Sequence, residues 1–212
     1  MTLTAEMART WMAKAQDPVW FCADTLGAKL WSKQAEVLTA LRRHKRVAVA
    51  SGHACGKTFV ASRAVAWFLL SHPGARVFTT APTYLQVTDN LWHEIRQMHA
   101  RSRRILGGEL LPQQPRWRLA GAPGWEAVGF STTDADAFQG RHGAHVLVVF
   151  DEAQGVADTI WQGAETLMTA PGARWLAIGN PTHSSGPFFD AFHGGQGWHA
   201  IRVSCLEHPN LA

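Results

Sequence analysis

A glycine-rich turn that joins a predicted buried strand to a predicted helix constrains this chain more than any other feature. The strand is Arg46 to Ala50 and the helix is Phe59 to Ser71, and the turn between them reads Ser51-Gly52-His53-Ala54-Cys55-Gly56-Lys57-Thr58. A strand that passes through such a turn directly into a helix is typical of α/β domains. The feature therefore favours a parallel sheet whose strands are linked by covering helices.

The turn has the Walker A pattern, which binds the phosphates of a nucleotide. Gly56 lets the backbone fold tightly, so that successive N–H groups and the helix N-terminus point at a β-phosphate. Lys57 is expected to bridge β- and γ-phosphate oxygens, and the Thr58 hydroxyl to bind Mg²⁺. The usual first glycine is Ser51 here, with Gly52 beside it, and small residues tolerate that turn. The alternative is a plain glycine-rich turn in which a lysine happens to follow.

Apolar, β-rich runs alternate with helical segments along the rest of the chain, which is the pattern of a parallel sheet covered on both faces. The expected fold class is therefore a three-layer α/β P-loop NTPase of the ASCE or RecA-like type, with a mainly parallel central sheet flanked by helices. We expect residues 1–45 to form an N-terminal helical segment and residues 46–212 to form the ATPase core. The further strands are expected at 75–80, 125–131, 145–150, 174–178 and 199–204, the further helices at 84–104, 160–170 and 188–192, and a loop or hairpin insertion at 107–124.

Two acidic residues end the most apolar of the predicted strands, His145 to Phe150. In open α/β sheets, ligands bind beyond the carboxyl ends of the strands. Asp151 is expected to hold Mg²⁺ through water, and Glu152 to orient and deprotonate the water that attacks the γ-phosphate. The alternative is that the two carboxylates merely end the strand with polar groups.

Two polar side chains near the expected nucleotide are weaker candidates. Asn180, in Gly179-Asn180-Pro181-Thr182 after the strand at 174–178, could sense the γ-phosphate by hydrogen bonding, or could belong to a simple Asn-Pro turn. Gln34 precedes the first strand by a helix length and could pair with both the donor and the acceptor edge of adenine. Surface glutamines are common, so this second assignment is weak by itself.

The net charge is +4, and the basic residues are clustered. Such clusters suit a nucleic-acid backbone, although a solvated basic face is equally consistent with them. Trp117 lies between two arginines and is a candidate for stacking on DNA. The clusters are Arg42, Arg43, Lys45 and Arg46, and then Arg101, Arg103, Arg104, Arg116 and Arg118.

The three cysteines and the apolar runs bear on the compartment. Cys22, Cys55 and Cys205 are odd in number, widely spaced and show no metal-ligand pattern, which favours free thiols in a reducing compartment. The N-terminus has no apolar signal-peptide stretch, and the longest apolar run is shorter than the ~20 residues of a membrane span. We expect a soluble, intracellular protein that is not secreted and has no membrane partner.

Taken together, these motifs resemble the large terminase subunit of tailed bacteriophages, the ATPase that pumps double-stranded DNA into an empty capsid. The order and spacing of the matching residues cover nearly the whole chain. They are Phe21, Leu30-Trp31, Gln34, Val37-Leu38, the turn at 51–58, Thr80-Ala81-Pro82-Thr83, Gln86, Val148-Val149-Phe150-Asp151-Glu152-Ala153 and Gly179-Asn180-Pro181-Thr182.

The resemblance implies ATP and Mg²⁺ as cofactors, an adenine contact for Gln34, and a coupling loop at Gly179 to Thr182. It also implies a ring, usually of five subunits, around double-stranded DNA, which works with a portal protein and a small terminase subunit in the cytoplasm of the infected bacterium. Some members carry an arginine in the phosphate turn, where this chain has His53. Arg141 is therefore our candidate for the arginine that stabilises the transition state.

Length limits what can be carried over from the resemblance. Large terminases resemble one another in having an RNase-H-like nuclease after the motor, which would need on the order of 150 further residues. The sequence stops at Ala212, so we expect a motor domain without DNA-cutting activity.

Three other classes of function are alternatives to a packaging ATPase. A P-loop helicase or translocase not involved in packaging shares the glutamine and the Walker motifs, but would need a second core domain. A basic DNA-binding module with a decayed nucleotide site is disfavoured, because Lys57, Thr58, Asp151 and Glu152 are all present. A zinc hydrolase on the helix that carries His93-Glu94 is rejected, since the position for its second histidine is Gln97.

Overall fold

The computed structural model describes residues 5–131, 138, 142–194 and 197–209. In this part of the chain, strands form an eight-stranded sheet in the order β3-β4-β5-β2-β6-β7-β1-β8. The pairs among β5, β2, β6, β7, β1 and β8 are parallel, and only β3–β4 and β4–β5 are antiparallel. The strands are β1 Arg46–Ser51, β2 Arg76–Ala81, β3 Glu109–Leu110, β4 Arg116–Arg118, β5 Glu126–Ser131, β6 His145–Asp151, β7 Gly172–Gly179 and β8 Trp198–Val203.

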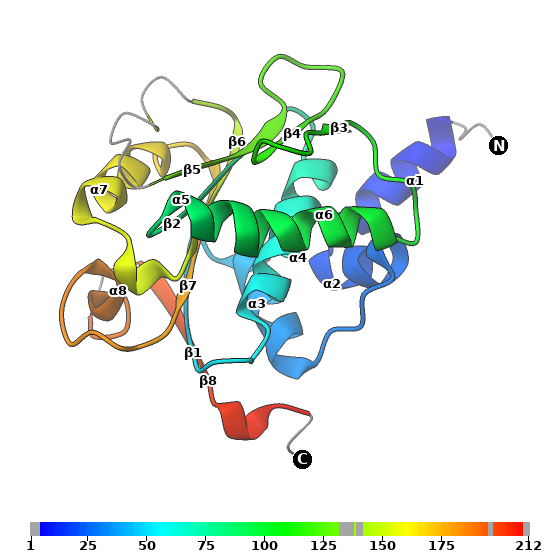
Figure 1. The fold of residues 1–212 in the computed structure, drawn as a ribbon. Coiled ribbons are helices and arrows are strands. Elements are labelled where there is room, and N and C mark those ends of the chain that lie inside the picture. The colour runs from blue at the N-terminus through cyan, green and yellow to red at the C-terminus, as the bar shows by residue number, and fades with distance from the viewer. Residues whose placement is uncertain (1–4, 132–137, 139–141, 195–196, 210–212) are drawn as a thin grey trace.

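Helices cover both faces of the sheet, as the continuous apolar strands require. Figure 1 shows α3 and α4 on one side of the sheet and α7, in yellow, on the other. The first layer contains α1 Ala5–Ala15, α2 Pro18–Phe21, η1 Cys22–Leu26, α3 Ser32–Arg43, α4 Lys57–Ser71, α5 Tyr84–Gln86, η2 Val87–Leu91 and α6 Trp92–Arg101; the second contains η4 Ala153–Gly155, α7 Asp158–Leu167 and α8 Pro187–Asp190.

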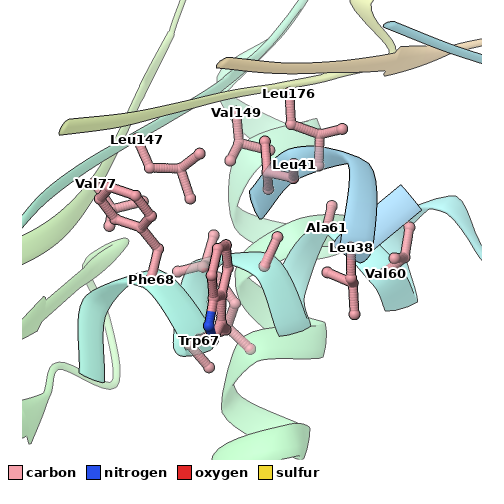
Figure 2. Close-up of a cluster of buried hydrophobic side chains, with 14 of the residues drawn as sticks. Leu38, Leu41, Val60, Ala61, Trp67, Phe68, Val77, Leu147, Val149 and Leu176 are labelled. Atoms are coloured by element: carbon pink, nitrogen blue, oxygen red, sulfur yellow. The ribbon is translucent and has the colours of Figure 1, made fainter. Parts of the chain in front are cut away.

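The larger part of the core lies between the sheet and α3, α4 and α6. Successive side chains of a strand point to opposite faces, so Leu147 and Val149 of β6 face this layer, whereas Val148 and Phe150 face α7. The N-terminal helices belong to the same core, and the Trp67 indole of α4 donates a hydrogen bond to the carbonyl of Ala15, at 3.0 Å. Figure 2 labels side chains of this cluster: Leu38, Leu41, Val60, Ala61, Trp67, Phe68, Val77, Leu147, Val149 and Leu176.

The sequence-based expectation of an α/β P-loop fold with a mainly parallel sheet is confirmed. The strands and helices lie within a few residues of their predicted bounds. The predicted long helix at 84–104 is the exception, because it is divided by the π-helical turn η2 between α5 and α6. No helix in the described residues has the length and apolar character needed to cross a membrane.

The interpretation of Trp117 as a DNA-stacking residue is wrong. The segment at 107–124 forms a short hairpin, β3–β4, that extends the sheet beyond β5. The Trp117 side chain is fully buried, and its indole donates to the carbonyl of Gly107 at 3.0 Å. Its two arginine neighbours, Arg116 and Arg118, both lie near Glu126, at 3.3 and 3.8 Å. The Arg-Trp-Arg run is therefore a strand with one face in the core.

Candidate active site

The glycine-rich turn lies where β1 ends and α4 begins. Ala54 and Gly56 both adopt left-handed backbone angles, with φ of 59° and 76°. Glycine takes this conformation freely, whereas for Ala54 it costs on the order of 1 kcal/mol, a strain of the kind that collects at functional sites. Gly56 directly precedes the first turn of α4, so the free N–H groups of that helix open toward the turn.

Lys57 is the first residue of α4, and its ammonium group is almost completely enclosed, with 9% of the residue exposed. It donates to the carbonyl of Gly52 at 3.0 Å and to Oδ1 of Asn180 at 2.9 Å. The predicted phosphate-binding and phosphate-sensing residues are therefore in direct contact. They meet because β1 pairs with β7, and Ala50 lies opposite Gly179 in the sheet.

The two predicted magnesium ligands also lie together. Asp151 ends β6, which pairs with β7, and it is 2% exposed. Its Oδ2 accepts a hydrogen bond from the Thr58 hydroxyl at 3.5 Å, and its Oδ1 accepts one from the amide of Glu152 at 3.1 Å. A hydroxyl and a carboxylate are the hard oxygen donors that Mg²⁺ prefers, so this pair of side chains fits the ion.

Burial changes the acidity of the Asp151 carboxyl. Removal from water, together with the neighbouring charge of Glu152, raises the pKa of Asp151 from 3.8 to about 6. Because the pKa is higher in the folded state than in the unfolded state, the carboxyl destabilises the fold increasingly between pH 4 and pH 6, and fully above pH 6. The cost at neutral pH is on the order of 2 to 3 kcal/mol.

Replacing Asp151 by asparagine should therefore make the nucleotide-free protein more stable at pH 8, by about 5 °C in Tm, while Mg²⁺-dependent nucleotide binding is lost. The gain should shrink at pH 4.5, where the wild-type carboxyl is protonated. Thermal unfolding of both proteins at the two pH values checks this. A variant that is less stable than the wild type at pH 8 would contradict the assigned effect of burial.

Glu152, the predicted general base, directly follows Asp151 in a left-handed conformation with φ of 48°. This turn brings the side chain back toward the edge of the sheet, where its Oε1 lies 4.0 Å from the ammonium of Lys57. The side chain is 25% exposed, so water can reach the carboxylate. The strained backbone positions this second acid beside the phosphate-binding lysine.

Gln154 connects the predicted base to the predicted coupling loop, and sequence reasoning missed it. Its Nε2 donates to Oε2 of Glu152 at 2.9 Å, and its Oε1 accepts the amide of Asn180 at 3.0 Å. A Cβ at Gly179 would lie 2.1 Å from this Oε1, so only glycine allows the contact. The Asp-Glu-Ala-Gln run and the glycine before Asn180 were the available signals, but neither specifies that the two segments touch.

The chain is similar in sequence and in fold to known phage proteins. A curated "Probable terminase, large subunit" of Enterobacteria phage P7 is 28% identical over 179 residues, which are 81% of this chain. The chain superposes on the large terminase ATPase domain of Thermus phage P74-26, in an arginine-to-alanine variant, with a TM-score of 0.65 and 18% identity over 98% of this chain and 88% of that one. The chain is similar to the phage large terminase subunit.

A second solved structure agrees with this relationship. The large terminase of the thermophilic bacteriophage D6E, in complex with ADP, superposes on this chain with a TM-score of 0.69 and 16% identity, over 87% of this chain. The chain spans 36% of the length of the curated phage P7 protein and 48% of the length of the terminase in the ADP complex. No protein-family model matches the chain.

Gln34 lies against the phosphate-binding turn: a Cβ at Gly56 would lie 2.6 Å from its Nε2, whereas its Oε1 is turned toward the start of its own helix. It is 8% exposed, and its Oε1 accepts the amide of Trp31 at 3.4 Å, which caps α3. The cavity beside it has a volume of about 10 Å³, which is too small for a base. A contact between Gln34 and adenine would require neighbouring groups to move, and it remains a prediction.

A larger cavity, of about 250 Å³, lies on the other side of the turn. It is lined by Ser51 and Gly52 of the turn, by Pro181, and by aromatic side chains of the α8 region, including Phe188 and Phe192. Its volume is compatible with a nucleoside group. The turn is thus flanked by one space that is too small for a base and one that is large enough.

The remaining predicted residues are placed as follows. His53 is exposed on the turn, where the sequence comparison expected an arginine in some relatives. Cys55, which belongs to the same turn, is buried. Arg141, the candidate transition-state arginine, lies outside the described residues.

Proposed function

We propose that this chain is the ATP-hydrolysing motor domain of a viral terminase large subunit, and that it drives double-stranded DNA into a procapsid. The observation that carries the proposal is the convergence of Lys57, Thr58, Asp151, Glu152 and Asn180 at the carboxyl ends of β1, β6 and β7. These neighbouring strands supply a phosphate grip, a metal-binding pair and a base within one cluster. The curated phage P7 relative and the solved terminase structures support the packaging role.

Nucleotide binding begins with the turn and Lys57. The backbone N–H groups of residues 52–57 receive the β-phosphate, and the lysine exchanges its hydrogen bond to Asn180 for γ-phosphate oxygens. Mg²⁺, when bound, would be held by Thr58 and Asp151 and would neutralise charge on the phosphates. Glu152 then accepts a proton from the attacking water, and an arginine, for which Arg141 is our candidate, stabilises the charge that develops.

Asn180 links hydrolysis to the rest of the motor. Its Oδ1 accepts a hydrogen bond from Lys57, so a bound γ-phosphate would compete with Asn180 for this ammonium group. Release of phosphate returns the lysine to Asn180 and pulls on the loop at 179–182. We propose that this exchange carries the state of the nucleotide to DNA-gripping surfaces of the ring.

The wider assignments are proposals of the same kind. Residues 1–45 form the helical segment that carries the adenine-contacting Gln34, and residues 46–212 form the ATPase core. Partners are double-stranded DNA, other copies of the chain in a ring of five, a portal protein and a small terminase subunit, in the cytoplasm of the infected bacterium. A helicase or other DNA translocase ATPase is the alternative function.

ATP hydrolysis by the purified domain tests the proposal, measured with and without duplex DNA over a range of salt concentrations. We expect Mg²⁺-dependent release of phosphate, stimulated by duplex DNA of any sequence, and a stimulation that falls steeply as salt rises. Stimulation by single-stranded DNA alone would favour the helicase alternative. Absence of hydrolysis under every condition would contradict the proposal.

Gln154 is a positioning residue in this scheme, since it holds the carboxylate of Glu152 and the backbone of Asn180 together. Replacing it by alanine should lower kcat about tenfold, the effect of one lost hydrogen bond of roughly 1.4 kcal/mol, and leave KM for ATP within about threefold. The Gln154→Glu variant keeps the acceptor for Asn180 but loses the donor to Glu152, so its kcat should fall at least as far. Steady-state kinetics of both variants, with Tm as a control, check this; a rise in KM alone would contradict it.

A further inference from the structure

Two thiols that are far apart in the sequence lie side by side at the phosphate-binding turn. Sγ of Cys55 and Sγ of Cys205 are 3.5 Å apart, although 150 positions separate the residues. Both thiols also lie near one acceptor, the carbonyl of His53, at 3.4 and 3.5 Å. Both cysteines are free. Closure of the gap to a disulfide bond of about 2.05 Å needs an approach of only about 1.5 Å.

The two partners differ in exposure in a way that favours stepwise oxidation. Cys205, in η5 Cys205–Glu207 after β8, is exposed, whereas Cys55 is 5% exposed and lies behind the turn. Solvent-borne oxidant therefore reaches Cys205 first. The hydrogen bond between the two thiols favours the protonated form of Cys205 and raises its pKa, so the reaction is slow at neutral pH and faster in mild alkali.

The segment that carries Cys205 also covers the neighbourhood of Gln34. Glu207 lies 3.6 Å from Lys33, and the ring of His208 is 5.5 Å from that of Trp31. A Cβ at Gly52 would lie 2.1 Å from Sγ of Cys205, so the thiol lies directly on the turn. The cavity beside Gln34 is only about 10 Å³ and is lined by Cys55 and by Val203, two residues before Cys205, so a base can enter there only if the walls of the cavity move.

We propose that Cys55 and Cys205 form an oxidisable thiol pair, and that their disulfide locks the segment after β8 onto the phosphate-binding turn and blocks nucleotide entry. Hydrogen peroxide is the oxidant: it converts the Cys205 thiol to a sulfenic acid and is itself reduced, releasing one water. The Cys55 thiol then attacks the Cys205 sulfur, forming the S–S bond and releasing a second water. The existence of the thiol pair does not depend on the proposed ATPase function. The effect of the disulfide on nucleotide binding does rest on that function.

The test treats the whole 212-residue chain with hydrogen peroxide at pH 8.5. We expect a peptide that joins residues 55 and 205, a mass loss of two hydrogens, and a Tm raised by roughly 5 to 10 °C, because a long loop is closed. Affinity for a slowly hydrolysed ATP analogue should fall at least tenfold and return with dithiothreitol. The Cys205→Ser variant should bind the analogue normally and resist oxidation, while Cys22→Ser should behave like the wild type.

The outcomes separate the two parts of the inference. Failure to find the 55–205 peptide, or linkage only between separate chains, would overturn the thiol pair. A 55–205 disulfide that leaves analogue binding unchanged would overturn its blocking role. If the reduced protein binds no nucleotide at all, the proposed ATPase fails, and the linked peptide still decides whether the thiol pair exists.

Discussion

Replacement of Lys57 by alanine should weaken ATP binding by at least a hundredfold and abolish measurable turnover. The ammonium group is enclosed by the turn and Asn180, and we assign to it the contacts with β- and γ-phosphate oxygens. Each charge-assisted hydrogen bond contributes about 1.5 to 3 kcal/mol, and two of them account for a loss of this size. Titration calorimetry with a slowly hydrolysed analogue measures the affinity, and phosphate release measures the turnover.

A matched control is available on the surface of the same domain. Lys29 is exposed and does not line either cavity beside the turn, so Lys29→Ala removes the same charge without touching the proposed site. It should bind nucleotide and hydrolyse it like the wild type. If Lys57→Ala binds ATP as tightly as this control, the turn is not the phosphate grip.

Replacement of Glu152 by glutamine should separate binding from chemistry. Glutamine keeps the size and polarity of the side chain but cannot accept the proton from water, so kcat should fall by roughly 10² to 10⁴. ATP affinity should stay within a few-fold of the wild type, because the phosphate-binding turn, Lys57 and Asp151 are unchanged. Single-turnover hydrolysis alongside equilibrium binding of ATP measures both quantities.

The surface variant Glu36→Gln is the control for loss of a carboxylate, since Glu36 pairs with Lys33 on the exposed side of α3. It should retain full activity. If Glu152→Gln also retains full activity, another group is the general base. If it instead loses affinity, the carboxylate acts on binding through its proximity to Lys57, at 4.0 Å.

The sequence predicted the fold and the meeting of the main site residues for a simple physical reason. Parallel strands have their carboxyl ends at one edge of the sheet, so residues that follow the β1, β6 and β7 strands must lie near one another. The sequence alone therefore predicts that Lys57, Asp151 and Asn180 lie at one site. Burial of Trp117 was not predicted, because an Arg-Trp-Arg run reads equally well as a basic loop and as an edge strand.

Contacts that depend on side-chain direction were beyond sequence reasoning. The bridge made by Gln154 requires the left-handed turn at Glu152 and the absence of a Cβ at Gly179. The thiol contact between Cys55 and Cys205 joins segments that are 150 positions apart, and it arises from the pairing of β8 with β1. Neither local propensity nor motif spacing carries that information.

A crystal structure of the domain with Mg²⁺ and a slowly hydrolysed ATP analogue tests the central claim most directly. We predict phosphates within hydrogen-bonding distance of the backbone N–H groups of residues 52–57, Lys57 turned from Asn180 to the γ-phosphate, and Mg²⁺ near Thr58 and Asp151. Adenine beside Gln34, rather than in the cavity next to α8, would support the assignment of that glutamine. An analogue bound elsewhere, with Lys57 still on Asn180, would contradict the account.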